Sequence, residues 1–166
     1  GNVIGGGDWN DNRLIPDIIK SLKNKKILHI RSPNSIRPWQ HVMEAVLIYI
    51  KLAMSLNYRF NKNGYETFNV GPLSNKKIKV INIVEYFKKT FPKFKYKIIK
   101  RKKKLKESKV LILNSNKVKK LIKINNTVDL INNLEMTSNW YSNFLDKNKI
   151  DKITVNQIKY FFDFYK

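Results

Sequence analysis

Two arginines six residues apart in a proline-rich stretch are the side chains best suited to binding an anion. Arg31 and Arg37 belong to Arg31–Val42, which reads Arg-Ser-Pro-Asn-Ser-Ile-Arg-Pro-Trp-Gln-His-Val. A guanidinium group binds phosphate through two parallel hydrogen bonds, and Pro33 and Pro38 stiffen the backbone that carries it. The stretch is predicted to be a rigid loop, not a strand, that presents arginines to a phosphate. Two solvated arginines on an exposed loop would fit the same spacing.

A glycine-rich segment at the start of the chain adds a second anion-binding feature. Gly1–Asp8 reads Gly-Asn-Val-Ile-Gly-Gly-Gly-Asp, and consecutive glycines let the backbone approach a ligand closely. It is not the dinucleotide fingerprint, which needs a helix directly after the glycines. The residues alone predict a site for a diphosphate-bearing ligand, made of this segment, Arg13, Arg31, Arg37 and Asn69.

Other catalytic and metal sites find little support in the sequence. The histidines are His29 and His41, and there is no cysteine, so thiolate chemistry is excluded and a metal site is not expected. Tyr-x-x-x-Lys occurs at Tyr58–Lys62 and Tyr96–Lys100. Neither stretch is expected to form the helical turn that would put both groups of an acid–base pair on one face. No catalytic residue is therefore assigned.

Short strands alternating with amphipathic helices are expected to position these residues, which makes the fold α/β. Apolar residues at helical spacing predict helices at residues 14–22, 41–56, 80–91, 115–122 and 127–144, and a last one from Thr154 that ends in a packed aromatic cluster. Apolar runs predict strands at residues 1–4, 27–30, 67–72 and 95–100, and residues 61–64 a turn. The expected capping residues are Asp11 or Asn12, Asn114 or Ser115, Thr127 and Thr154.

The composition fits one domain with a basic surface. The chain has 166 residues, 42% of them hydrophobic, and its formal net charge of +22 comes from 34 Lys+Arg against 12 Asp+Glu. Such a charge attracts any polyanion, so a basic nucleic-acid-binding module is an alternative function. However, the charges are mostly lysine and are spread along the chain, with one cluster at Lys100–Lys104. Specific nucleic-acid binding is therefore not expected.

The apolar runs are far too short to span a membrane, and the absence of cysteine agrees with a cytoplasmic location. The chain begins inside what reads as the end of a strand, so it is expected to be cut from a longer protein.

Several strings of residues resemble CDP-glucose 4,6-dehydratases, a branch of the extended short-chain dehydrogenases/reductases. The strings Gly-Asn-Val-Ile-Gly-Gly-Gly-Asp-Trp, Arg-Leu-Ile-Pro-Asp and Ile-Arg-Pro-Trp-Gln-His-Val occur in the family's order and spacing. Similar segments occur at residues 68–72, 107–117, 140–141 and 154–158. Related sugar-nucleotide epimerases and reductases, the second enzyme alternative, usually carry Arg-Asp-Trp or Arg-Asp-Tyr in place of Arg-Pro-Trp.

The resemblance implies the carboxyl-terminal, substrate-binding part of an extended Rossmann-type enzyme. Residues 1–166 would be one substrate-binding domain, with residues 1–30 including the last elements of a truncated Rossmann domain. The full enzyme would use bound NAD to oxidise C4 of CDP-glucose, eliminate water and give CDP-4-keto-6-deoxyglucose, in deoxysugar and lipopolysaccharide O-antigen biosynthesis. The NAD loop and the catalytic Tyr/Lys pair would precede Gly1, so this chain alone is expected to be inactive. A homodimer is expected for the full-length protein.

The same resemblance implies which residues hold the sugar nucleotide. They are Asn2, Arg13, Leu14, Ile15, Arg31, Arg37 and Asn69. Asn2 would contact the sugar and phosphates, and residues 13–15 would lie beside the nucleotide. Arg37 would bind the diphosphate with support from Asn69. Alternatively, Arg37 would only pair with Glu44 on the adjoining helix.

Overall fold

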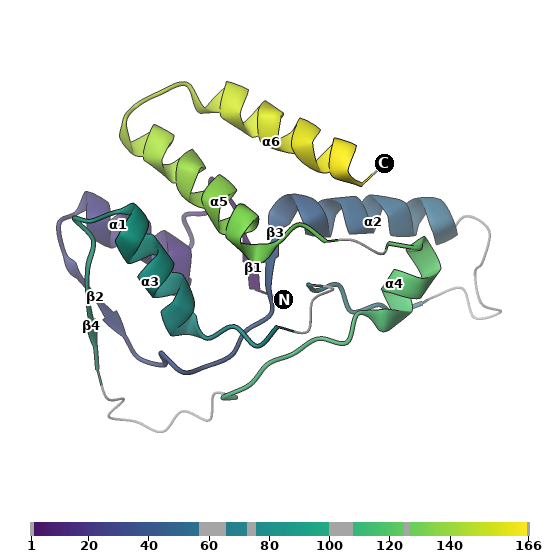
Figure 1. Cartoon of the computed structure of the whole chain (residues 1–166), viewed down its shortest axis with the longest axis horizontal. Helices are drawn as coiled ribbons and strands as arrows, with labels where there is room; N and C mark the ends of the chain where they lie inside the picture. The colour runs from purple at the N-terminus through teal and green to yellow at the C-terminus, as the bar shows by residue number, and fades with distance from the viewer. Residues whose placement is uncertain (1, 57–65, 73–75, 100–107, 125–126, 166) are drawn as a thin grey trace.

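Six helices and four short strands make up the described part of the chain (Figure 1). The computed structural model describes residues 2–56, 66–72, 76–99, 108–124 and 127–165. The strands are β1 (Asn2–Ile4), β2 (Ile27–Ile30), β3 (Trp39–His41) and β4 (Lys95–Ile98). The helices are α1 (Leu14–Lys23), α2 (Val42–Leu56), α3 (Val80–Thr90), α4 (Asn116–Ile122), α5 (Leu130–Leu145) and α6 (Ile150–Phe164). The prediction of an α/β chain is confirmed.

The strands form two separate parallel pairs. β1 pairs with β3 so that Asn2 lies opposite Trp39, and β2 pairs with β4. Parallel strands require a long crossover, and α1 with β2 provides the one between β1 and β3. The ends of β1 and β3 therefore lie side by side. A Cβ atom on Gly5 would fall 2.6 Å from Cγ1 of Val42, the first residue of α2.

Strand β3 corrects the prediction that all of Arg31–Val42 is a loop. Its three residues are buried, although two of them are polar. The backbone N–H of Asn2 donates to the carbonyl of Pro38 at 2.8 Å, which holds the chain extended beside β1. A proline just before a strand removes no ladder hydrogen bond. The prediction was wrong here because it judged the stretch by its polarity and not by its pairing.

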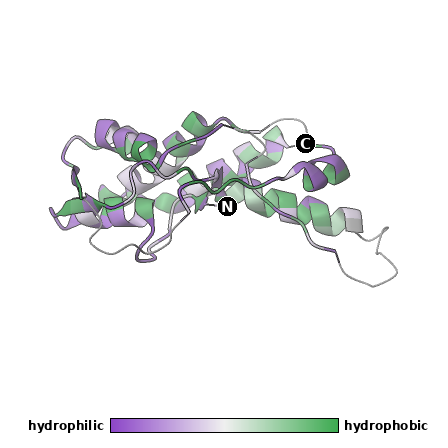
Figure 2. Cartoon of the chain, turned by 90° about the horizontal axis from the view of Figure 1, so that it is seen from below, coloured by the Kyte–Doolittle hydropathy of each residue, from purple (hydrophilic) through white to green (hydrophobic). Residues whose placement is uncertain are grey.

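Two hydrophobic cores lie on either side of the β1–β3 pair. The first lies between α1, α3, α5 and both sheets and includes Ile18, Ile83, Phe87, Phe94 and Tyr141, all at 0% exposure. The second lies between α2, α4 and α6 and includes Ile48, Val118 and Phe161. Figure 2 shows hydrophobic and hydrophilic residues alternating along most helices, as amphipathic packing requires.

Helix α2 differs from the others because it is apolar on both sides. Its inner face buries Ala45, Leu47, Ile48 and Leu52 in the second core. Its outer stripe, defined as Val42, Val46, Tyr49, Ile50 and Met54, is between 37% and 68% exposed. The long helix at the lower right of Figure 2 is accordingly drawn in green and pale shades. A helix that is hydrophobic all round is typical of one covered on every side.

Several predicted boundaries and caps were wrong. Helix α6 begins four residues before Thr154, whose hydroxyl donates to the carbonyl of Ile150 and accepts from Nε1 of Trp140, both at 2.9 Å. Helix α5 is capped by Asp129 instead of Thr127, since its carboxylate accepts from the backbone N–H of Ile131 at 3.1 Å. In both cases a hydroxyl residue was predicted to cap a helix at a position that is not its N-cap.

The other differences concern shorter segments. Residues 67–72 do not form a strand, and the predicted turn at residues 61–64 lies outside the described residues. Ser115, one of the two expected caps, occupies the cap position of α4 but makes no side-chain capping hydrogen bond, and the preceding Asn114 side chain accepts from the N–H of Asn116 at 3.0 Å. In the aromatic cluster that ends the chain, Phe161 and Tyr165 are buried, and Tyr160 and Phe164 pack against their rings although both are at least 40% exposed. Phe162 is 47% exposed.

Candidate functional site

The glycine segment after β1 is fixed by the last helical hairpin of the chain. A Cβ atom on Gly6 would lie 2.1 Å from the ring of Trp140 on α5, so no larger residue fits without displacing that ring. Gly7 has a φ of +81°, which favours glycine. Both glycines are therefore needed for local packing and backbone conformation.

The residues after the glycines are held by the same helix. The buried hydroxyl of Tyr141 donates to the backbone carbonyl of Asp8 at 2.7 Å, and burial raises the pKa of Tyr141. The ring of Trp9 packs edge-on against Tyr141 at 5.5 Å and against Phe144 at 4.8 Å. The backbone of residues 6–9 is thus anchored against α5 at three points.

A cavity of about 640 Å³ opens beside this anchored segment. Its walls come from β1, from the first turn of α1, from the end of β2 and from the loop before β3. Six of the seven residues predicted to hold a ligand line it: Asn2, Arg13, Leu14, Ile15, Arg31 and Arg37. Residues from three separate segments of the sequence therefore line one cavity.

Asn69, the seventh predicted residue, does not line this cavity. Its side chain is exposed on the 67–72 segment. The neighbouring Gly71 packs against Leu113, where a Cβ atom would meet Leu113 Cδ1 at 2.9 Å, and its carbonyl accepts from the Ser115 hydroxyl at 3.4 Å. The segment thus packs beside the start of α4 and not at the cavity. The structure does not place Asn69 near the other six predicted residues.

The cavity carries charges of both signs. Nη1 of Arg13 lies 3.4 Å from Oδ2 of Asp8, and Nη1 of Arg37 donates to the carbonyl of Ile36 at 2.8 Å. Asp17 also lines the cavity, and its pKa is raised by burial. Arg37 is half-buried, whereas the Arg13 side chain is 58% exposed. An anion in this cavity would therefore contact Arg37 in less solvated surroundings than it would contact Arg13.

The first turn of α1 adds backbone donors to the wall. Arg13 directly precedes the helix and makes no capping hydrogen bond, so neither Asp11 nor Asn12 occupies the predicted cap position. Asn12 instead adopts a left-handed φ of +62° and also lines the cavity. The first N–H groups of a helix have no partner within the helix and carry a partial positive charge, which suits an anion.

The alternative partner for Arg37, Glu44, lies in the second core. The hydroxyl of Tyr165 donates to the Glu44 carboxylate, and burial raises the pKa of Glu44. Among the described residues, no ion pair joins Arg37 to Glu44. The arginine and the carboxylate therefore serve different regions of the molecule.

The histidines and tyrosines considered as catalytic candidates have structural or surface positions. The ring of His41 is buried and stacks on Phe161 at 4.7 Å, and burial lowers its pKa to about 4. Its Nδ1 accepts from the N–H of Met43 at 3.3 Å. Tyr96 lies on β4, as expected, while Tyr58 and Lys62 lie outside the described residues.

The described residues hold neither a metal-binding cluster nor a membrane-spanning helix. Within them, no three histidine, aspartate or glutamate side chains gather in a way that suits a metal ion. Of the helices that the structure describes, none combines the length and apolar character that a membrane crossing needs.

Sequence reasoning missed the two carboxylates of the cavity and the indole of Trp39. Asp8 follows the three glycines directly, and this position beside a candidate ligand loop was a usable signal. Asp17 lies two residues beyond Ile15, in the first turn of α1. Trp39 was treated as part of the stiff loop, yet it lines the cavity from β3. Its burial follows from the pairing with β1, which no local pattern reveals.

The sequence comparison identifies a relative for part of the chain. No protein-family model matches the chain. A curated protein, CDP-glucose 4,6-dehydratase from Salmonella typhimurium, is 53% identical over 72 residues. The chain resembles CDP-glucose 4,6-dehydratase. The match covers 43% of this chain and 20% of the relative, so the resemblance seen in the sequence is confirmed over that part.

Solved structures support the fold. UDP-glucuronic acid 4-epimerase from Bacillus cereus, solved with UDP-glucuronic acid and NAD, matches with a TM-score of 0.63 and 17% identity over 86% of this chain and 43% of that one. An NAD-dependent NDP-hexosamine 5,6-dehydratase of tunicamycin biosynthesis matches with a TM-score of 0.65 and 16% identity over 90% of this chain and 44% of that one. This chain has the fold of part of a Rossmann-type extended short-chain dehydrogenase/reductase, and it spans less than half of these proteins.

Proposed function

We propose that this chain supplies the sugar-nucleotide site of an NAD-dependent sugar-nucleotide 4,6-dehydratase, which in its full-length form is a homodimer and acts on CDP-glucose. The observation that carries the proposal is the cavity, where three arginines from two segments of the sequence meet the first turn of a helix. The sequence similarity to CDP-glucose 4,6-dehydratase supports the choice of substrate.

In this proposal the arginines bind the diphosphate. Two opposite charges 4 Å apart attract each other by about 1 kcal/mol in bulk water but by about 4 kcal/mol near a partly desolvated protein surface. The half-buried Arg37 therefore contributes more than Arg13 or Arg31, which are exposed. The free N–H groups at the start of α1 provide further donors to the phosphates.

The remaining predicted residues position the rest of the ligand. The side-chain amide of Asn2, at the start of β1, donates to and accepts from groups of the sugar or phosphates. Leu14 and Ile15 present apolar surface next to the nucleotide. Asn69 has no role in this cavity, because its segment packs beside the start of α4.

NAD does not fit the glycine segment of this chain. Gly6 is covered by the ring of Trp140, and helix α1 begins only at Leu14, so the backbone is not free to cradle a dinucleotide phosphate. We therefore assign NAD binding and the hydride transfers to a domain outside residues 1–166. Residues 1–30 would include the last elements of that Rossmann domain. The outer stripe of α2 supports this division, since a larger α/β fold would cover it.

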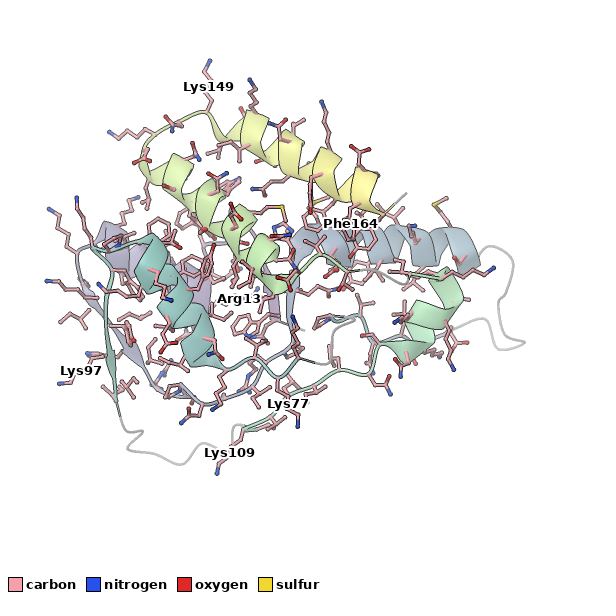
Figure 3. All side chains as sticks on the ribbon, viewed as in Figure 1. Arg13, Lys77, Lys97, Lys109, Lys149 and Phe164 are labelled. Carbon is pink, nitrogen blue, oxygen red and sulfur yellow. The ribbon has the colours of Figure 1, made fainter. Side chains whose placement is uncertain are left out.

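The net charge favours one function of a different class, a basic nucleic-acid-binding module. Lysines such as Lys97, Lys109 and Lys149 extend from separate edges of the molecule (Figure 3). A nucleic-acid interface usually gathers its basic residues on one face. We therefore regard the charge as a general surface property.

The two functions are separated by measuring binding to the full-length protein at two salt concentrations. CDP-glucose, UDP-glucose and a short DNA duplex are titrated calorimetrically, and the conversion of CDP-glucose is followed by NMR. We expect CDP-glucose to bind best and to give the 4-keto-6-deoxy product. Strong duplex binding with a steep salt dependence, and no sugar-nucleotide binding, would refute the proposal. Conversion to an epimer without loss of water would instead indicate a related epimerase.

A further inference from the structure

Asp8 is one of two acidic side chains that line the cavity beside three arginines, and it is held rigidly at the wall. Its backbone carbonyl accepts from Tyr141 at 2.7 Å. Its Oδ1 accepts from the backbone N–H of Asn10 at 3.1 Å and from the Asn10 side-chain amide at 2.7 Å. Both the main chain and one carboxylate oxygen are therefore fixed, so the orientation of the second oxygen is set before any ligand arrives.

That second oxygen faces Arg13. The distance from Oδ2 to Nη1 is 3.4 Å, which is a loose contact for a charge-assisted hydrogen bond. The Asp8 side chain is 23% exposed, and both residues line the cavity. The Oδ2 atom thus retains capacity to accept another hydrogen bond from something in the cavity.

A carboxylate in this position has opposite effects on two kinds of ligand. It repels a bare phosphate and competes with it for Arg13. It attracts a hydroxyl group, because an ionised carboxylate accepts hydrogen bonds and cannot donate them. A site meant only for phosphate gains nothing from such a residue, whereas a site for a ligand with both diphosphate and hydroxyl groups gains discrimination.

We propose that Asp8 is a specificity-determining residue, which accepts a hydrogen bond from a sugar hydroxyl of the ligand and disfavours diphosphates that lack one. This inference rests on the function proposed above. It assigns the two kinds of charged residue to different parts of the ligand: arginines to the diphosphate and Asp8 to the hydroxyl-bearing part.

The test compares CDP-glucose with inorganic pyrophosphate by calorimetric titration of the full-length protein. The variant Asp8→Asn has nearly the same shape but no charge. We expect it to bind pyrophosphate about tenfold more tightly, because Arg13 is released and repulsion is removed, and to bind CDP-glucose no better than the unmodified protein. Its preference for CDP-glucose over pyrophosphate should therefore fall at least tenfold. An equal change for both ligands would overturn the proposal.

Asp11→Asn is the matched control. Asp11 lies three residues away in the same loop, its side chain is 82% exposed, it pairs with Lys20 and it does not line the cavity. This control should leave the preference unchanged. A loss as large as that of Asp8→Asn would show a general effect of charge and would also overturn the proposal.

A second variant covers the case in which Asp8→Asn does not fold. Asp8→Glu keeps the charge but moves it by one methylene group, so it should still bind pyrophosphate weakly while binding CDP-glucose at least fivefold more weakly. Unchanged affinity for CDP-glucose would refute the role of Asp8. If the unmodified protein bound no sugar nucleotide at all, the proposed function itself would fail, and this result is distinct from both outcomes above.

Discussion

The indole of Trp140 lies against the backbone of Gly6 so closely that a Cβ atom there would come within 2.1 Å of the ring. The ring cannot easily move away, because it is buried and its Nε1 donates to Thr154 at 2.9 Å. This contact joins the loop beside the cavity to both helices of the carboxyl-terminal hairpin.

Gly6→Ala should therefore destabilise the protein. Overpacking a filled site typically costs about 1–3 kcal/mol, and we expect a loss in that range in the free energy of unfolding measured with urea. Gly7→Asn is a suitable control, since asparagine tolerates a positive φ and the nearest Trp140 atom would be 3.7 Å from the new Cβ. Equal losses for the two variants would argue against close packing at Gly6.

Arg37→Ala in the full-length protein should weaken binding of CDP-glucose by about 2–4 kcal/mol, as expected when one partner of a desolvated charge pair is removed. The amount of bound NAD should not change. Lys97→Ala removes the same charge from the exposed surface of β4 and should have little effect on the calorimetric affinity. An unaltered affinity in Arg37→Ala would remove this residue from the proposed site.

Tyr165→Phe should destabilise the protein by about 1–3 kcal/mol, because it leaves the buried Glu44 carboxyl group without the hydroxyl that donates to it. Tyr160→Phe removes an exposed hydroxyl from the same helix and should change the unfolding free energy by less than about 0.5 kcal/mol. A double-mutant cycle with Glu44→Gln checks the origin of the effect. Additive losses would mean that the two side chains do not interact.

The lowered pKa of His41 predicts how the free energy of unfolding depends on pH. Burial lowers its folded-state pKa to about 4 from an ordinary value of 6.5, so the unfolded chain binds more protons between these values. The stability that His41 contributes is complete above pH 6.5 and is lost as the pH falls towards 4. Since one pKa unit corresponds to 1.36 kcal/mol, this loss should total about 3 kcal/mol.

The measurement is urea unfolding at a series of pH values. His41→Phe retains a ring that stacks on Phe161 and should lose less stability on acidification than the unmodified protein does. His29→Gln alters an exposed residue on β2 and should follow the unmodified protein. Identical slopes for His41→Phe and the unmodified protein would show that other groups cause the acid sensitivity.

The sequence correctly predicted features that depend on residues close together in the chain. The apolar spacing of Ile15, Ile18, Ile19 and Leu22 is local, and it located α1 to within a residue at its carboxyl-terminal end. The six cavity residues were also found from short strings. Strand β3 was missed because its burial depends on pairing with β1, which lies more than thirty residues earlier in the sequence.

Interactions between distant residues account for the rest. Asn69 was grouped with the arginines from its place in a predicted strand and from the resemblance of a short string, but its segment packs against Leu113 and Ser115. The contacts of Asp8 with Tyr141, 133 residues later, have no signature in either segment. Propensity and periodicity therefore predicted the helices and three of the strands, while tertiary contacts decided the third strand, β3, and what faces the cavity.

The hydrogen bond from Tyr141 to the carbonyl of Asp8 couples the cavity wall to a helix that lies 133 residues later in the sequence. A ligand that binds beside Asp8 would therefore also stabilise α5 and α6, which do not line the cavity. If the proposed site is correct, proteases that cut between α5 and α6 should act more slowly when CDP-glucose is bound, and a protein that lacks these two helices should bind the sugar nucleotide more weakly.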